Sequence, residues 1–167
     1  MPKYSPEAIR TIALTGHGGA GKTTLAEALL ARAGAITGIG AVEKGTTVCD
    51  FDPLEKQYQH SLNASVVHLE HQDTRIHLVD TPGLPDFVGR AIGALPAVET
   101  AAVVVSAQNG IEMITNRMMQ WAKKRDLCRM IIVNKIDGEN VDLAGLLAKL
   151  QAAFGKECLP INLPAGG

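Results

Sequence analysis

The chain has 167 residues, enough for one ordinary domain that buries about two-thirds of its unfolded surface. Hydrophobic residues make up 46% and charged residues 20%, a balance that is typical of a globular protein and argues against a disordered one. The formal net charge is −1 and the longest apolar runs are too short to span a bilayer, so we expect neither DNA binding nor membrane association.

Three cysteines, Cys49, Cys128 and Cys158, are odd in number, widely spaced and without a C-x-x-C pair. This usage predicts reduced thiols, and the polar N-terminal stretch has no signal-peptide pattern, so we expect a cytoplasmic protein. Cys49 lies in a segment that we expect to be mobile, and its thiol could be accessible, but no redox role is predicted.

Hydrophobic periodicity predicts strands at residues 11–15, 66–71, 75–79, 102–106, 130–133 and 158–161. It predicts helices at 25–31, ending near Gly34, at 87–98, kinked or broken near Pro96, at 111–121 and at 141–154. In the third helix, one apolar face would carry Ile111, Ile114, Met118 and Trp121. Residues 35–45 predict a flexible connection, and the aperiodic 46–63 stretch indicates a functional or disordered segment.

The segment after the first predicted strand fits the phosphate-binding pattern G-x-x-x-x-G-K-[ST]. Its glycines let backbone N–H groups point at an anion, and the following helix N-terminus adds unpaired donors. Lys22 is expected to contact the β- and γ-phosphates and the Thr23 hydroxyl a Mg²⁺ ion. A chance glycine-rich turn is disfavoured, because all four defining positions and both flanks agree. The phosphate-binding residues are expected to be Gly16, His17, Gly18, Gly19, Ala20, Gly21, Lys22, Thr23 and Thr24.

These elements predict an α/β protein with a P-loop NTPase fold, in which helices cover both faces of a mostly parallel sheet. The short connection between 66–71 and 75–79 predicts one antiparallel hairpin strand. In such sheets ligands bind beyond the carboxyl ends of the strands. Residues 16–24, 80–83 and 134–137 each begin where a predicted strand ends, so we expect these three loops to meet at one edge.

The second loop carries a D-x-x-G motif, which is a weak signal alone but a strong one after a buried strand and downstream of a phosphate loop. Asp80 is expected to hold Mg²⁺, most simply through a water, because a hard cation beside phosphates favours carboxylate ligands. The N–H of Gly83 can reach the γ-phosphate, since no side chain blocks its approach. Hydrolysis would release that contact. Lys22 would neutralise charge that develops on the phosphates, so Lys22 and Gly83 are the predicted catalytic residues.

The third loop, Asn134, Lys135 and Asp137 in an N-K-x-D pattern, predicts the base. A carboxylate at Asp137 can accept hydrogen bonds from guanine N1–H and the 2-amino group, a donor pair that adenine lacks. The Lys135 stem can lie along the base plane, and Asn134 can link this loop to the phosphate loop. We therefore expect GTP or GDP as the ligand, with Mg²⁺. A polar turn at a strand end is the weaker interpretation, and an ATP-using enzyme is disfavoured by Asp137.

With these motifs in this order, the sequence resembles the translational GTPases and is similar to elongation factor G and elongation factor G-like proteins. The resemblance covers nearly the whole chain and rests on residues 46–53, 80–87 and 133–137. It implies a GTP-binding domain over residues 1–167, a ribosomal partner and a monomeric fragment. The family's last guanine-binding loop, which contains Ser-Ala, is not present, so we expect a domain truncated from a longer factor.

Three positions depart from this family. Leu84 stands where elongation factor G has a histidine that positions the attacking water, and leucine can neither orient nor polarise water. Gly19 replaces an aspartate, which removes one possible cation ligand. Counting from Asp50 without gaps places Ser61 where the family supplies a threonine to Mg²⁺, and serine keeps the hydroxyl. The expected Mg²⁺ ligands are therefore Thr23, Ser61 and Asp80.

Two functions remain open on these residues: a GTPase switch with slow intrinsic hydrolysis, and a GTP- or GDP-binding module that scarcely hydrolyses because of Leu84. A zinc site is not predicted. His68 and His71 would lie on opposite faces of one strand, and zinc needs convergent ligands. His17 stands where the family's phosphate loop also has histidine, which suggests a role in the shape of the loop.

Overall fold

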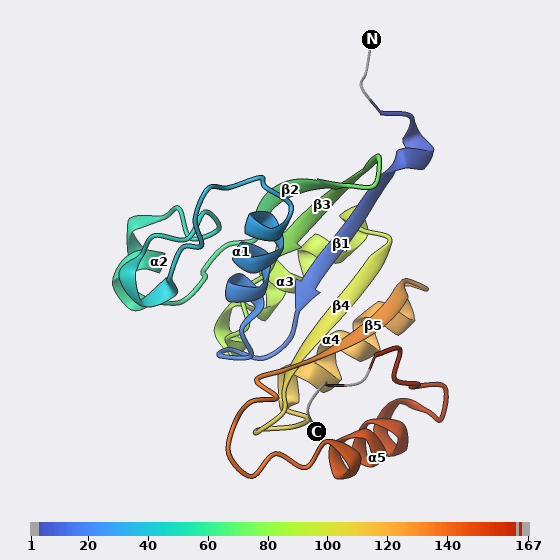
Figure 1. Cartoon of the computed structure of the whole chain (residues 1–167). Coiled ribbons are helices and arrows are strands. Elements are labelled where there is room, and N and C mark those ends of the chain that lie inside the picture. Colours follow the sequence, from blue (N-terminus) through green and yellow to red (C-terminus); the bar gives the residue numbers. More distant parts are fainter. Residues whose placement is uncertain (1–3, 163, 165–167) are drawn as a thin grey trace.

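The computed structural model of the chain describes residues 4–162 and 164, which form a five-stranded sheet flanked by helices (Figure 1). The strands are β1 (Ile9–Thr15), β2 (Ser65–His71), β3 (Thr74–Asp80), β4 (Thr100–Ser106) and β5 (Cys128–Asn134). Their order across the sheet is β2-β3-β1-β4-β5. Only the β2–β3 pair is antiparallel and the other three pairs are parallel, so the predicted fold class is confirmed.

The helices are α1 (Lys22–Arg32), α2 (Pro53–Tyr58), α3 (Val88–Ala94), α4 (Met113–Lys124) and α5 (Leu143–Phe154). Short 3₁₀ turns are present at Pro6–Ala8, Val42–Lys44, Pro85–Phe87 and Leu95–Ala97. The change from α to 3₁₀ geometry at Leu95 confirms the predicted break near Pro96, since proline cannot donate to the preceding turn. Gly34, with φ of 71°, follows the end of α1 as predicted.

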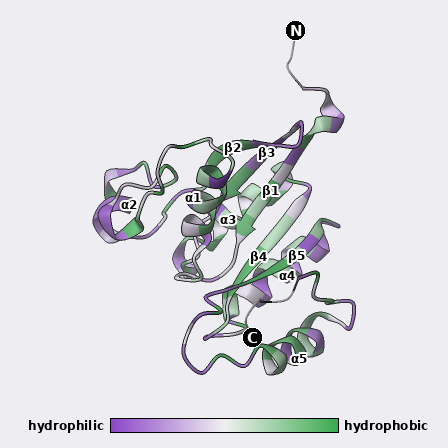
Figure 2. Cartoon of the chain, viewed as in Figure 1, coloured by the Kyte–Doolittle hydropathy of each residue, from purple (hydrophilic) through white to green (hydrophobic). Residues whose placement is uncertain are grey.

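The core lies on both faces of the sheet. On one face Leu30 of α1 packs against Leu69 and Leu78. On the other, Leu95, Met118 and their neighbours pack against Ala13 and Val103, while α5 adds a further cluster through Leu146 and Leu150. Figure 2 shows the apolar residues concentrated on the central strands. Fully buried strands such as β4 therefore read as continuous apolar runs.

Three expectations need correction. The 46–63 stretch is not irregular throughout, because it contains α2, whose N-terminus is closed by a capping box of Asp52 and Glu55. No strand forms at 158–161, where the Leu159 and Ile161 side chains are 71% and 86% exposed. The third predicted helix, α4, begins at Met113, so Ile111 lies outside it and packs with the α5 cluster instead.

Candidate functional site

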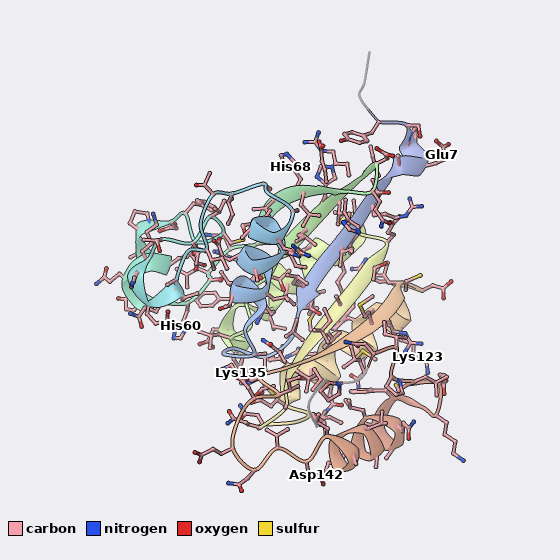
Figure 3. The ribbon with its side chains drawn as sticks, in the orientation of Figure 1. Glu7, His60, His68, Lys123, Lys135 and Asp142 are labelled. Carbon is pink, nitrogen blue, oxygen red and sulfur yellow. The ribbon has the colours of Figure 1, made fainter. Side chains whose placement is uncertain are left out.

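Three loops meet at the carboxyl edge of the parallel strands, and hydrogen bonds join them. The Gly18 N–H donates to the Gly83 carbonyl at 2.9 Å, which joins the first loop to the second. The Asn134 side-chain amide donates to the Ala20 carbonyl at 3.0 Å, so the predicted link from the third loop to the phosphate loop is present. Figure 3 shows Lys135 at this same edge of the sheet.

The path of the 16–21 loop depends on glycine at two positions. Gly16 has φ of 129°, and a Cβ there would lie 2.3 Å from the Val104 carbonyl oxygen. Gly21 has φ of 92°, and a Cβ there would lie 2.4 Å from the amide nitrogen of Asn134. Any larger residue would strain the backbone and push the strand or the third loop away. The glycines of the motif therefore set the spacing of the site.

Lys22 opens α1 with its side chain only 6% exposed. Its Nζ donates to the His17 carbonyl at 2.8 Å. Burial lowers the pKa of this ammonium, and the nearby carboxylates of Asp80 and Glu112 act in the opposite direction. A buried cation at the mouth of a loop of backbone N–H groups is suited to binding an anion such as phosphate.

A hydroxyl–carboxylate network lies beside Lys22. The Thr23 hydroxyl donates to Asp80 Oδ2 at 2.6 Å, and the Ser61 hydroxyl donates to Asp50 Oδ1 at 2.8 Å. The two hydroxyl oxygens are 3.3 Å apart. Each hydroxyl has one proton, so with both protons on carboxylates these oxygens face each other with lone pairs. The structure thus brings together the three residues expected to hold Mg²⁺.

The Asp80 carboxyl group is almost completely buried, and its Oδ1 atom has no hydrogen-bond partner. Burial is the largest effect on its pKa, which is raised to about 6, although the Thr23 hydroxyl and the Lys22 charge favour the ionised form. An unpartnered buried carboxylate oxygen beside two hydroxyl oxygens is a set of hard oxygen donors, which fits Mg²⁺.

The 80–84 loop closes over the phosphate loop. A Cβ at Gly83 would lie 2.3 Å from Lys22 Nζ and 2.6 Å from the Gly18 nitrogen, so only glycine fits. The next residue, Leu84, places its Cδ2 atom 3.0 Å from where a Cβ of Gly18 would stand. The leucine side chain therefore covers the phosphate loop at Gly18 and brings no polar group to it.

The guanine-side loop is more open than the phosphate side. Lys135, with φ of 58°, and Asp137 are both exposed, and Asn134 is half-buried. A Cβ on Gly138 would lie 2.4 Å from the side-chain amide of Gln108, so the loop turns close to the end of β4. The Asp137 carboxylate is thus available to a ligand at the surface.

Three buried carboxylates near the site were not identified from the sequence. The Asp50 carboxylate, 2% exposed, accepts from Thr47 and Ser61. The Glu27 carboxylate accepts from the N–H groups of Gly40 and Val48. Glu55 carries a signal that could have been recognised, because Asp52, Pro53 and Glu55 have capping-box spacing. Glu27, in contrast, looks like an ordinary polar residue of a helix.

The histidines of the hairpin and the Cys49 thiol bear on whether the chain holds a zinc or redox site. His68 lies opposite His77 across the hairpin, with ring centroids 6.0 Å apart. Among residues 4–162 and 164, no group of three or more His, Cys, Asp or Glu side chains could hold a metal ion. Cys49 is buried, which corrects the expectation of an accessible thiol. Burial is the largest of the causes that raise its pKa to about 12.

In the same described part of the chain no helix is long and apolar enough to cross a membrane.

The sequence of this chain is similar to those of known proteins. Residues 7–161 match the family described as "Elongation factor Tu GTP binding domain". The chain is 38% identical over 161 residues to an "Elongation factor G-like protein" of Mycobacterium tuberculosis, covering 96% of this chain and 22% of the relative. It is 36% identical over 168 residues to "Peptide chain release factor 3" of Enterococcus faecalis, covering 98% of this chain and 32% of the relative.

Two solved structures share the fold of this chain. A crystal structure of a Thermus thermophilus protein superposes with a TM-score of 0.86 and 42% identity, covering 89% of this chain and 22% of that one. A bacterial selenocysteine-specific elongation factor shares the fold with a TM-score of 0.67 and 24% identity, covering 86% of this chain and 23% of that one. The chain thus spans between about a fifth and a third of the relatives' length. Since the family match covers nearly all of its residues, the chain belongs to the elongation factor Tu GTP binding domain family.

Proposed function

We propose that this chain is the Mg²⁺-dependent, GTP-hydrolysing switch domain of an elongation factor G-like translation factor that acts on the ribosome. The observation that carries the proposal is the group formed by the buried Lys22 ammonium, the unpartnered Asp80 oxygen and the facing hydroxyls of Thr23 and Ser61. A triphosphate would place negative charge beside the Lys22 ammonium. Its cation would place positive charge beside the Asp80 carboxylate and the two hydroxyl oxygens.

In this proposal the residues of the phosphate loop, 16–24, surround the phosphates with backbone N–H groups. Thr23, Ser61 and Asp80 would hold Mg²⁺, which when bound neutralises charge on the phosphate oxygens. Lys22 would leave the His17 carbonyl for the β- and γ-phosphates. The Gly83 carbonyl already accepts from the Gly18 N–H, so this residue lies against the phosphate loop, and its own N–H would donate to the γ-phosphate.

Guanine would be bound by Asn134, Lys135 and Asp137, with Asp137 accepting from the N1–H and 2-amino groups. The half-buried Asn134 already contacts the phosphate loop, so the base and phosphate loops would respond to one nucleotide together. We also propose that the factor acts on the ribosome, that it is cytoplasmic and that this chain is monomeric. These remain proposals because the chain spans only part of the length of its relatives.

A second candidate function is a GTP- or GDP-binding module with little hydrolysis, and Leu84 favours it. The Leu84 side chain packs over Gly18 beside the expected γ-phosphate position and has no atom that could orient water. The switch would hydrolyse GTP slowly, whereas the module would scarcely hydrolyse it. Single-turnover measurement with labelled GTP separates them, since the module would release no phosphate above the rate of GTP in buffer.

Calorimetric titration of the 167-residue chain with GDP, GTP and ATP in Mg²⁺ tests the proposal, with Asp137→Asn beside it. We expect guanine nucleotides to bind, ATP not to compete, and the variant to bind GDP more weakly. If no nucleotide binds, the same titration on a longer factor containing this chain is decisive. Failure there as well would contradict a nucleotide-binding function.

Hydrolysis on the ribosome is tested with Leu84→His in a longer factor containing this chain. Imidazole can accept a hydrogen bond from water, so stimulated turnover should rise by about a hundredfold or more, in line with the usual contribution of a positioned base. Leu84→Gln and Leu84→Met are matched controls of similar size, one polar and one apolar. Unchanged turnover in Leu84→His would contradict the role assigned to this position.

A further inference from the structure

The segment from Asp52 to Asn63 is closed on itself by one buried carboxylate. Glu55, which is 1% exposed, accepts from the Asp52 N–H at 3.1 Å through Oε2. Through Oε1 it accepts from the N–H groups of Leu62 and Asn63, both at 2.9 Å. The same side chain therefore holds the residue before α2 and the end of the segment after it, which makes 52–63 one preformed unit.

This unit ends beside the proposed Mg²⁺ ligands. Ser61 directly precedes the two residues held by Glu55, and its hydroxyl lies 3.3 Å from that of Thr23. Ser61 has only one rotatable bond between its backbone and its hydroxyl oxygen, so that oxygen stays beside Thr23 only while the backbone of 61–63 keeps its place. Contacts that hold Leu62 and Asn63 therefore help to place the Ser61 oxygen, together with the Asp50 carboxylate that accepts from this hydroxyl at 2.8 Å.

The second contact on these residues comes from α3. Arg90 Nη1 donates to the Leu62 carbonyl at 2.7 Å and also to the Asn63 side-chain oxygen. Its guanidinium lies over the Phe87 ring, 5.8 Å from the centroid. Leu62 is thus held on its N–H by Glu55 and on its carbonyl by Arg90.

Arg90 belongs to the helix that follows the Asp80–Gly83 loop. A 3₁₀ turn, Pro85–Phe87, runs directly into α3, so a change in the peptide of Gly83 reaches Arg90 through a short, continuous segment. The hydrogen bonds that Arg90 donates join α3 to the 61–63 backbone and to the Asn63 side chain.

We propose that Arg90 is a positioning residue of the Mg²⁺ site, which couples α3 to Ser61 through Leu62 and Asn63. This inference rests on the proposed function, in which Ser61 is a Mg²⁺ ligand. When hydrolysis ends the contact of Gly83 with the γ-phosphate and α3 shifts, Arg90 would withdraw its donors and release the Ser61 oxygen. The nucleotide state would then be transmitted between the two segments by one arginine.

The coupling needs an arginine rather than a positive charge alone. A planar guanidinium can donate to a carbonyl and an amide oxygen while it stacks on an aromatic ring, whereas an ammonium is a compact point charge. The contacts are partly exposed, so their loss should cost about three- to tenfold in the property they control. Arg90→Lys should keep only a small part of the effect.

The test measures release of a fluorescent, non-hydrolysable GTP analogue from the full chain, with Mg²⁺ and with EDTA. In Mg²⁺, Arg90→Ala should release the analogue about three- to tenfold faster than the parent chain, Ser61→Ala likewise, and the double variant no faster than Ser61→Ala alone. In EDTA the Arg90→Ala and parent rates should be equal. Arg117→Ala, on the exposed side of α4, is the matched arginine control and should change neither rate.

The outcomes separate the two proposals. Acceleration by Arg90→Ala in EDTA as well as in Mg²⁺, or additive effects in the double variant, would make the role merely structural and overturn the inference. A Mg²⁺-dependent parent that responds to Ser61→Ala but not to Arg90→Ala overturns it too, while leaving the proposed function intact. Release that ignores Mg²⁺ in the parent chain would instead overturn the metal site on which both depend. If Arg90→Ala does not fold, Arg90→Gln is measured in its place.

Discussion

The phosphate half and the guanine half of the site are built in different ways. On the phosphate side, Lys22 and Asp80 are buried, and the loop geometry excludes any residue but glycine at Gly83. On the guanine side, Lys135 and Asp137 are exposed at the surface. Buried charges act in a lower effective dielectric than exposed ones. We therefore expect the phosphate half to supply most of the affinity and the guanine half mainly the choice of base.

Lys22→Ala should have the largest effect on this comparison. It removes the buried positive charge while leaving Asp80 in place, so the site would lose its main attraction for phosphate and keep a carboxylate that repels it. We expect GDP affinity to fall by about a hundredfold, consistent with breaking a buried charged contact. Calorimetry measures it, and Lys123→Ala on the exposed face of α4 is the matched control. A loss no greater than that from Asp137→Asn would break the proposed division.

Asp80→Asn tests the electrostatics of the same half. The Asp80 pKa is raised to about 6 from 3.8, mainly by burial, so between these values the folded state binds this proton more tightly than the unfolded state. Stability of the nucleotide-free chain should therefore fall as pH rises through this window. At pH 7.5 without Mg²⁺, Asp80→Asn should be more stable than the parent by on the order of 3 kcal/mol.

Urea unfolding at a series of pH values from about 4.5 to about 7.5 measures this difference, with Asp142→Asn as the control for an exposed helix-capping carboxylate. In saturating GDP and Mg²⁺ the order should reverse, because only the parent chain gains stability from the metal. Parallel pH profiles for the parent chain and Asp80→Asn would show that this carboxyl group does not carry the effect.

Asp137→Asn addresses the exposed half. The amide cannot accept both guanine hydrogen bonds, so GDP should bind about tenfold more weakly, in keeping with the loss of one or two exposed contacts. Xanthosine diphosphate carries a carbonyl where guanine carries its 2-amino group, so its affinity should rise in the variant because the amide can donate. Competition titrations measure both ligands. Equal changes for the two nucleotides would mean that Asp137 does not contact the base.

What could be predicted from the sequence follows the same division. The 16–24, 80–83 and 134–137 loops have fixed residue types at fixed spacing, because each contact to a nucleotide requires one particular group. The supporting carboxylates Glu27 and Asp50 were not predicted, since any segment within reach can supply the N–H and O–H groups that they bind. Their burial depends on how residues 40–63 fold over α1. That segment shows no hydrophobic periodicity from which its fold could be predicted.

Strand prediction failed at 158–161 for a related reason. An apolar, β-prone stretch forms a strand only when a partner offers its backbone groups, and Leu159 and Ile161 remain exposed. The 46–63 stretch failed in the opposite direction. It looks aperiodic because α2 has only six residues, Pro53–Tyr58, too few for a helical repeat, and its stability comes from the cap and from Glu55 rather than from an apolar stripe.

The smallest expected effect concerns how firmly the segment beside the phosphate half is held. The Cys49 thiol is buried and its pKa is raised to about 12, so at pH 8 it is almost entirely protonated and should react with iodoacetamide far more slowly than the exposed Cys128. Glu27→Gln replaces one of the two carboxylate oxygens that accept from the Gly40 and Val48 N–H groups by an amide donor. The 40–48 segment should therefore loosen, and Cys49 labelling should rise a few-fold. Mass spectrometry of the labelled peptides measures it, with Glu139→Gln as the exposed control. Rapid labelling of Cys49 in the parent chain would show that this segment is open, and that the phosphate half is less firmly held than its buried contacts imply.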